Sequence, residues 1–200
     1  MQRLGIQTYL DRLQGLGPKG MQLDRVQEVL ADGVLDEATL RPFMGARTDK
    51  YARRLIYRGP AFEMLLLTWL PGQYTPVHNH AGSCGWVRLV RGQIAEDAYR
   101  LVPGASLPEA GVANDPAGRG GSVGLEPTGS GVISQIGAVC NVDRVRAIHR
   151  LGNPETAVDT TVTLHVYAPA HDACLSFDLA RRTCARRELA YDPLVEQPLV

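Results

Sequence analysis

The sequence has no excess of either charge, because its 21 Lys and Arg residues match its 21 Asp and Glu residues. This balance gives no electrostatic basis for nucleic acid or an anionic membrane surface as the main partner. No apolar run approaches the roughly 20 residues that a transmembrane helix needs. The opening residues, MQRLGIQTYLDRLQ, include Asp11 and several other polar side chains, so we do not expect a signal peptide.

Cysteine is also scarce. The four cysteines stand at irregular spacing, as Cys84, Cys140, Cys174 and Cys184. This spacing does not suggest a disulfide framework, and it favours reduced cysteines in a cytoplasmic protein. Apolar residues make up 44% of the 200 residues, which is typical of a soluble globular protein with one domain and a sizeable core.

The pattern of the chain changes near residue 48. Residues 1–48 are predicted to form helices, with two apolar stripes at helical spacing and a third helix beginning in LDEATLRPF. Residues 49–190 contain short β-branched and aromatic segments separated by Gly, Pro and Asn, which predicts a mainly β, antiparallel sandwich or barrel. Residues 103–131 are predicted to be a long surface loop with short strands at its edges, and 191–200 an extended tail.

A pair of histidines indicates a metal site. His78 and His80 stand one residue apart in PGQYTPVHNHAGSCGWVRLVRG, and alternate residues of a strand point to the same face. Such a pair alone is more often packed or surface-exposed. Its spacing from Gly72 and Gly92, however, matches the first metal motif of the cupins, although Gly85 stands where that motif has a glutamate ligand.

The third ligand must therefore come from another segment. The best candidate among the five histidines is His149, which lies in a later predicted strand and is followed by Asn153, as in the second cupin motif. A hydrogen-bonded core histidine is the alternative. Three neutral imidazoles would leave the charge of a divalent metal uncompensated, which favours an anionic ligand such as a thiolate, but the same set also fits zinc hydrolysis.

The sequence resembles the cysteine dioxygenases, a cupin branch that contains mononuclear non-haem iron. The resemblance runs from Tyr51 to Asp178 and rests on YARRL, TWLPGQYTPVHNH, HRLGNP and TLHVYAPAHDACLSFD. It implies a cupin-type, jelly-roll-like antiparallel β-barrel in a monomer. It also implies that Fe(II) is the cofactor and that the protein converts L-cysteine and O₂ to cysteine sulfinic acid, in taurine and sulfinate metabolism. The Fe(II) ligands would be His78, His80 and His149.

The resemblance also implies roles for residues around the metal. Arg53 would hold the substrate carboxylate, with Tyr51 beside it, and Arg54 would lie on the surface. The catalytic pair would be His165 and Tyr167, in a row that starts at Thr163; a β-strand places all three on one face, where they can hydrogen-bond. Ordinary core packing is the alternative for Thr163, for Trp69 and in part for His165, but not for Tyr167.

The chain departs from the animal enzymes at one position. Their cysteine that is cross-linked to the active-site tyrosine aligns with Gly85 here, and the neighbouring Cys84 should face away from Tyr167 because adjacent strand residues alternate. We therefore predict no thioether between Cys84 and Tyr167. The family also has a cis peptide at the position of Ala168-Pro169.

Three other functions compete with cysteine oxidation. The nearest is a dioxygenase of another small thiol such as 3-mercaptopropionate, and enzymes of that type typically carry glutamine where Arg53 lies. The second is a cupin that binds a metal without turnover or acts as an isomerase, since a fold alone does not decide function. The third is zinc hydrolysis, for which only His165 offers a general base.

Overall fold

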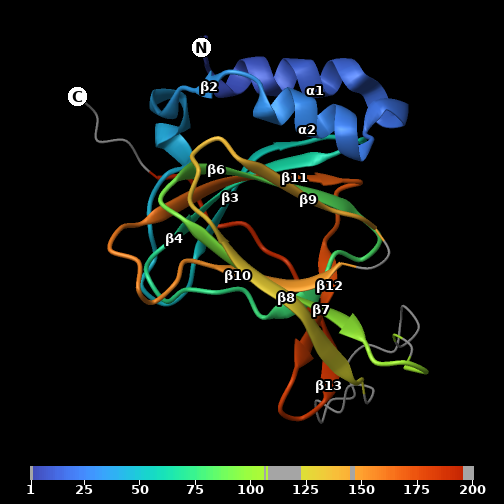
Figure 1. The fold of residues 1–200 in the computed structure, drawn as a ribbon. Coiled ribbons are helices and arrows are strands. Elements are labelled where there is room, and N and C mark those ends of the chain that lie inside the picture. The colour runs from blue at the N-terminus through green and yellow to red at the C-terminus, as the bar shows by residue number, and fades with distance from the viewer. Residues whose placement is uncertain (1, 106, 108–122, 145–146, 196–200) are drawn as a thin grey trace.

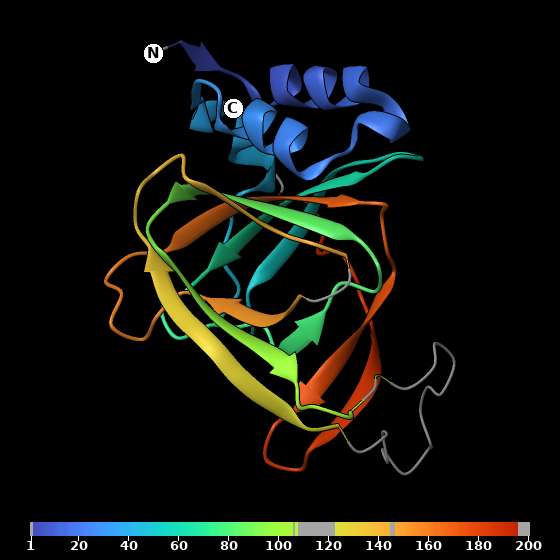
Figure 2. The same cartoon turned by 45° about the vertical axis from the view of Figure 1, so that its right-hand side comes forward.

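The computed structural model describes residues 2–105, 107, 123–144 and 147–195. Two antiparallel sheets curve around a shared interior, and the N-terminal helices cover the outside of one of them (Figures 1 and 2). The prediction of a mainly β, cupin-type antiparallel barrel with a small N-terminal helical region is confirmed. Among the described residues, no helix is long and apolar enough to cross a membrane.

The two sheets contain five and six strands. In spatial order, the first sheet consists of β3 (Ala52–Arg58), β4 (Glu63–Trp69), β11 (Thr161–Ala168), β6 (Cys84–Arg91) and β9 (Val139–Val142). The second consists of β13 (Thr183–Glu188), β12 (Ala173–Asp178), β5 (Val77–Asn79), β10 (Ile148–Gly152), β7 (Ile94–Leu101) and β8 (Leu125–Ile133).

The helical region consists of α1 (Ile6–Gly20), α2 (Leu23–Ala31) and the 3₁₀ helix η1 (Glu37–Phe43). A short parallel pair, β1 (Arg3–Leu4) and β2 (Val34–Leu35), closes it. The apolar stripes of α1 and α2 pack on the outer face of the five-stranded sheet, where buried Arg88 of β6 donates to Tyr9 Oη at 2.9 Å and Gly33 O at 2.8 Å. The third predicted helix, in LDEATLRPF, is the 3₁₀ helix η1. Pro42 near its end has no backbone N–H to donate, so it does not favour a longer helix.

Strand β11 separates the interior from the helix-covered face. Leu164 and Val166 belong to the core beneath the helices, whereas Tyr167 belongs to the interior core with residues of β4 and β6. The alternation of a β-strand therefore turns Thr163, His165 and Tyr167 inward. The peptide Ala168-Pro169 at the end of β11 is cis.

Two local expectations differ from the structure. Arg54 was expected on the surface, but only 7% of it is exposed, because η1 and the C-terminal segment cover β3 on that side. Its guanidinium donates to Pro193 O at 2.8 Å and Gly45 O at 2.5 Å. The predicted loop 103–131 ends in the long strand β8 from Leu125, while residues 106 and 108–122 lie outside the described part of the chain.

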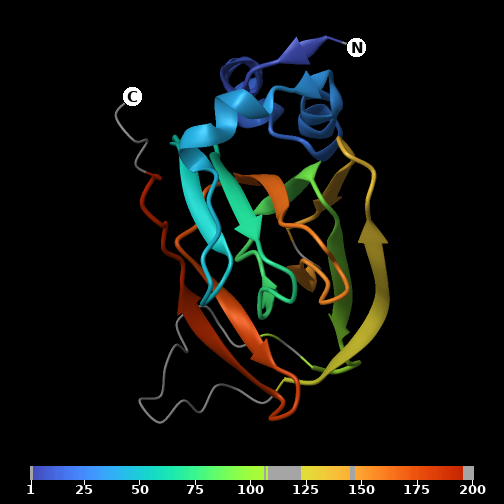
Figure 3. The ribbon, with the colours of Figure 1, turned by 90° about the vertical axis from the view of Figure 1, so that its left-hand side faces the viewer.

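The C-terminal segment runs beside β3 (Figure 3). Residues 191–195, within the predicted tail, have no regular secondary structure. They are nevertheless hydrogen-bonded to the barrel, because Asp192 N donates to Arg53 O at 2.7 Å. Residues 196–200 of the predicted tail are not among the described residues.

Candidate metal centre and adjoining pocket

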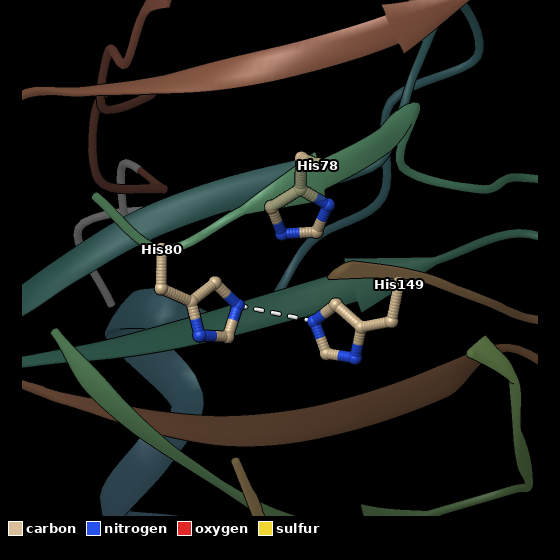
Figure 4. A group of neighbouring side chains, drawn as sticks. All are labelled: His78, His80 and His149. Carbon is tan, nitrogen blue, oxygen red and sulfur yellow. Dashed lines mark hydrogen bonds between the residues drawn. The ribbon is translucent and has the colours of Figure 1, made fainter. Parts of the chain in front are cut away.

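Neighbouring strands bring the three predicted ligands together. His78 lies on β5 and His80 directly after it, so both face the interior. His149 lies on β10, the strand beside β5, directly opposite His78 in the register. One ring nitrogen from each residue lies within 4.8 Å of the other two, and within the described chain these three form the single group of metal-binding side chains (Figure 4).

Hydrogen bonds orient these rings. Nδ1 of His78 is 3.0 Å from Pro76 O, so it carries the proton and leaves Nε2 as the ligand atom. Nδ1 of His149 donates to Glu96 Oε1 at 2.5 Å, and its Nε2 faces Nε2 of His80. Burial lowers the pKa of His78 to about 3 and holds that of His80 well below its usual value, so both rings are neutral at pH 7.

This geometry fits a divalent transition metal. The Nε2 atoms of His80 and His149 are 3.0 Å apart (Figure 4). Two nitrogens that are each about 2.1 Å from one ion, at right angles to each other, are about 3.0 Å apart. Neutral imidazole is the form that binds metal, and it is the form of His78 and His80 at pH 7.

Glu96 is the contact that the sequence interpretation missed. It lies on β7 next to β10 and accepts a hydrogen bond from His149, so a carboxylate lies close to the three histidines although it is not one of the ligands. The uncompensated charge that the three imidazoles alone imply is therefore partly offset. A carboxylate in this position also fixes the ring and makes it a more basic ligand.

The Glu96→Gln substitution is expected to lower metal affinity by about 10- to 100-fold, because the uncharged amide is a weaker partner for His149. Chelator competition measures this affinity. The matched control is Asp97→Asn: Asp97 is the next residue on β7 but binds Arg150 Nε at 2.6 Å instead of a histidine. Equal losses of metal affinity in both variants would contradict the assignment.

Gly85 makes room for His80. A Cβ added to Gly85 would lie 3.0 Å from Cε1 and 3.1 Å from Nδ1 of the His80 ring. Gly85 also stands directly opposite Tyr167 in the pairing of β6 with β11. A side chain at this position would be crowded against the His80 ring, which would have to shift slightly to make room for it.

Cys84 and Tyr167 lie on opposite faces of the five-stranded sheet, since Cys84 belongs to the core beneath the helices and Tyr167 to the interior core. We predict an intact mass equal to that of the unmodified chain. A loss of two hydrogens that peptide mapping places on these two residues would contradict this arrangement.

A row of hydrogen bonds ends at Tyr167. Trp69 Nε1 donates to Thr163 Oγ1 at 2.8 Å, Thr163 Oγ1 lies 2.8 Å from His165 Nε2, and His165 Nδ1 lies 3.0 Å from Tyr167 Oη. The indole can only donate, so the threonine hydroxyl is satisfied when it donates to Nε2 and Nδ1–H donates to the phenol oxygen. In this tautomer the hydroxyl proton of Tyr167 is left for another partner. Thr163 and Trp69 thus take part in the row and are not simple core packing.

Burial keeps this row uncharged. It lowers the pKa of His165 to about 3 and raises the pKa of Tyr167 above its usual value. At pH 7 the imidazole is therefore neutral and the phenol keeps its proton. Both groups are therefore uncharged hydrogen-bonding partners.

The predicted substrate residues line the same cavity as His78 and His80. This small cavity opens to solvent, and its lining includes Tyr51, Arg53, His78, His80, His165 and Tyr167. Tyr51 stacks on Trp69 with ring centroids 4.4 Å apart. Arg53 is 8% exposed; it donates to Glu63 Oε1 at 3.3 Å and to Ala190 O at 3.5 Å, which leaves further N–H donors for a ligand.

Other lining residues were not singled out from the sequence. His171 lies edge-on to Tyr167 with ring centroids 5.0 Å apart, and burial lowers its pKa to about 4. Cys174 and Arg187 face each other across β12 and β13, with Arg187 at the exposed rim of the cavity. Burial raises the pKa of Cys174 to about 11, so its thiol is protonated at pH 7.

The sequence model of the cysteine dioxygenase type I family matches residues 13–180. The chain belongs to this family. One curated relative, cysteine dioxygenase type 1 of Danio rerio, is 25% identical over 130 residues, which cover 64% of this chain and 56% of the relative. The chain therefore spans little more than half of that relative's length.

Solved structures with a similar fold include two bacterial proteins. The TT1209 protein of Thermus thermophilus has a TM-score of 0.41 and 21% identity, over 65% of this chain and 93% of that protein. A cupin 2 domain-containing protein of Halorhodospira halophila has a TM-score of 0.40 and 17% identity, over 68% and 77% of the two chains.

Proposed function

We propose that this protein is an Fe(II)-dependent thiol dioxygenase that converts L-cysteine and O₂ to cysteine sulfinic acid. One observation carries the proposal: three histidines converge, and two of them line one cavity together with a guanidinium and a buried phenol. The reaction, R–SH + O₂ → R–SO₂H, takes both oxygen atoms into the product and needs no external reductant. Bound Fe(II) would supply the activation of O₂ and the acidification of the substrate thiol.

The ligand set supports iron in this role. His78, His80 and His149 would hold the metal through their Nε2 atoms and leave its remaining positions to substrates. Imidazole suits iron, and a set of three neutral ligands favours an anionic fourth ligand such as a thiolate. The charge of Glu96 lies behind His149 and not in the cavity, so it does not compete with that ligand.

Arg53 and Tyr51 are proposed to bind and orient the substrate. The guanidinium presents a planar fork, which grips a carboxylate through two parallel hydrogen bonds. The Tyr51 phenol lies in the same lining, and burial raises its pKa, so it is a neutral hydrogen-bond donor. A carboxylate held at Arg53 would leave the thiol of a small amino acid to face the histidines.

Tyr167 and His165 are proposed as the catalytic pair. Tyr167 lines the cavity, and when His165 Nδ1–H donates to the phenol oxygen, the Tyr167 hydroxyl can itself donate to a developing negative charge on oxygen or sulfur. His165 stabilises that orientation by donating through Nδ1 to the phenol oxygen. The cavity excludes much of the solvent around this pair, which strengthens both hydrogen bonds.

The proposal extends to the setting of the enzyme. The irregular spacing of the four cysteines, which suggests no disulfide framework, supports a cytoplasmic location, and a sulfinate product would place the enzyme in taurine and sulfinate metabolism. We propose that the protein acts as a monomer on small-molecule substrates.

Metal reconstitution tests this function. Protein purified without O₂, stripped of metal and reloaded with Fe(II), is expected to consume O₂ when L-cysteine is added, whereas zinc-loaded protein is expected to consume none. Comparison with 3-mercaptopropionate identifies the substrate, because a strong preference for that thiol would overturn the choice of cysteine. Iron-loaded protein that is inactive with every small thiol would refute the dioxygenase.

A further inference from the structure

The C-terminal segment contacts Arg53 although it lies beyond residues 13–180, which match the family. Asp192 bonds the backbone of Arg53 on both sides: its N–H donates to Arg53 O at 2.7 Å, and its Oδ2 accepts from Arg53 N at 2.7 Å. Arg47 binds the other carboxylate oxygen of Asp192, and Ala190 O accepts from the Arg53 guanidinium at 3.5 Å. The segment is thus fastened at the point where Arg53 enters the cavity.

Tyr191 is the side chain of this segment that touches the guanidinium. Its ring lies under Arg53, with 4.9 Å between the guanidinium carbon and the ring centroid (the segment runs beside β3 in Figure 3). Its hydroxyl donates to Glu63 Oε2 at 2.5 Å and accepts from Arg58 Nη1 at 2.8 Å. The ring is therefore fixed at its far end by two charged groups.

Glu63 completes this arrangement from the barrel side. It is fully buried at the start of β4, and its two carboxylate oxygens are divided between Arg53, at 3.3 Å from Oε1, and Tyr191, at 2.5 Å from Oε2. A carboxylate buried in this way has to be paired, so it holds both partners in place. The Arg53 guanidinium is consequently confined between an aromatic face and an anion.

We propose that Tyr191 is a positioning residue for Arg53 and that residues 190–192 form part of the subsite for the substrate carboxylate. This inference rests on the proposed function in one respect: Arg53 has to be the group that binds the carboxylate. An arginine has many rotamers, and ordering it only when substrate binds would weaken binding. A guanidinium held in advance by a stacked ring avoids that loss and presents its free N–H groups in one direction.

If Tyr191 positions Arg53, its loss should weaken the binding only of thiols that carry a carboxylate. Loss of the Tyr191 ring should weaken the binding of L-cysteine, whereas cysteamine, which has the thiol and the amine but no carboxylate, should bind as before. A purely structural role of Tyr191 would affect both thiols equally. The ratio of the two affinities therefore separates positioning from general destabilisation.

The test compares Tyr191→Leu and Tyr191→Phe with the wild type, as Fe(II)-loaded proteins titrated with L-cysteine and cysteamine in the absence of O₂. We expect Tyr191→Leu to raise the dissociation constant for L-cysteine ~10-fold, since the stacked face is lost. We expect Tyr191→Phe to raise it ~3-fold, since only the anchoring hydroxyl is lost. Cysteamine should bind each variant as it binds the wild type.

Tyr74→Leu is the matched control, because the Tyr74 ring also lies under an arginine, Arg150 at 4.8 Å, but neither residue lines the cavity. The ratio of its dissociation constants for L-cysteine and cysteamine should equal that of the wild type.

Equal losses of affinity for both thiols in the Tyr191 variants, or no loss of affinity for either, would overturn the proposal. If Tyr191→Leu does not fold, the same comparison on Tyr191→Phe decides. Binding is measured without turnover, so an absence of O₂ uptake would refute the proposed function alone.

Discussion

The His149→Ala substitution is expected to remove bound metal and thiol-dependent O₂ uptake together. His149 is one of the three proposed ligands, and its Nε2 lies 3.0 Å from that of His80. Loss of a ligand should cost more than the about 10- to 100-fold in metal affinity that loss of its hydrogen-bond partner costs. Metal analysis after reconstitution and dialysis should find much less than one iron per chain. The rate of thiol-dependent O₂ uptake should fall in proportion to the iron content.

His171→Asn is the control for this result. His171 lines the same cavity, and its ring centroid is 6.3 Å from that of His80, but it is not part of the three-histidine group. The variant should retain about as much iron as the wild type. A His149→Ala protein that still bound iron with wild-type affinity would contradict the ligand assignment, whatever its activity.

The Arg53→Gln substitution is expected to lower kcat/KM for L-cysteine by about 100-fold, which corresponds to about 3 kcal/mol for loss of one partner of a buried, charged hydrogen-bonded pair. The effect should be larger for L-cysteine than for cysteamine, which has no carboxylate. Arg53→Lys should recover little, because a lysine keeps the charge but not the planar fork. Oxygen-uptake kinetics with both thiols measure these differences.

Arg54→Gln separates this effect from a loss of stability. Arg54 is as buried as Arg53, with 7% against 8% exposed, but it binds backbone carbonyls outside the barrel and does not line the cavity. The substitution should lower the melting temperature without changing the preference between the two thiols. Comparable changes in thiol preference for the Arg53 and Arg54 variants would contradict the role of Arg53.

Strand alternation accounts for most of what the sequence could predict. The i, i+2 spacing of His78 and His80, and of Thr163, His165 and Tyr167, predicts side chains that share a face, and the structure turns both sets into the interior. The same rule predicts that Cys84 faces away from Tyr167, and in the structure the two side chains lie on opposite faces of the sheet.

The same rule could also have identified the two inward-facing acids. Glu96 follows buried Ile94 at i+2 on β7, and Glu63 precedes inward-facing Leu65 at i−2 on β4, so both had to face the interior. Acidic residues at inward positions need partners, which His149 and Arg53 provide. This signal was present in the sequence but was not used.

Contacts between distant segments could not be predicted in this way. Tyr191 lies in an irregular tail, where no periodicity indicates which side chain faces the barrel. The burial of Arg54 depends on residues of η1 and of the C-terminal segment, and neither is fixed by the local pattern of β3. Such contacts follow from tertiary packing alone.

The most direct test of the central claim is to let the Fe(II)-loaded protein react with L-cysteine under ¹⁸O₂ and to determine the mass of the product by mass spectrometry. Our account predicts cysteine sulfinic acid in which both sulfinate oxygens are ¹⁸O, formed in amounts equal to the O₂ consumed. Cystine as the sole product, or sulfinate that contains one oxygen from water, would contradict it.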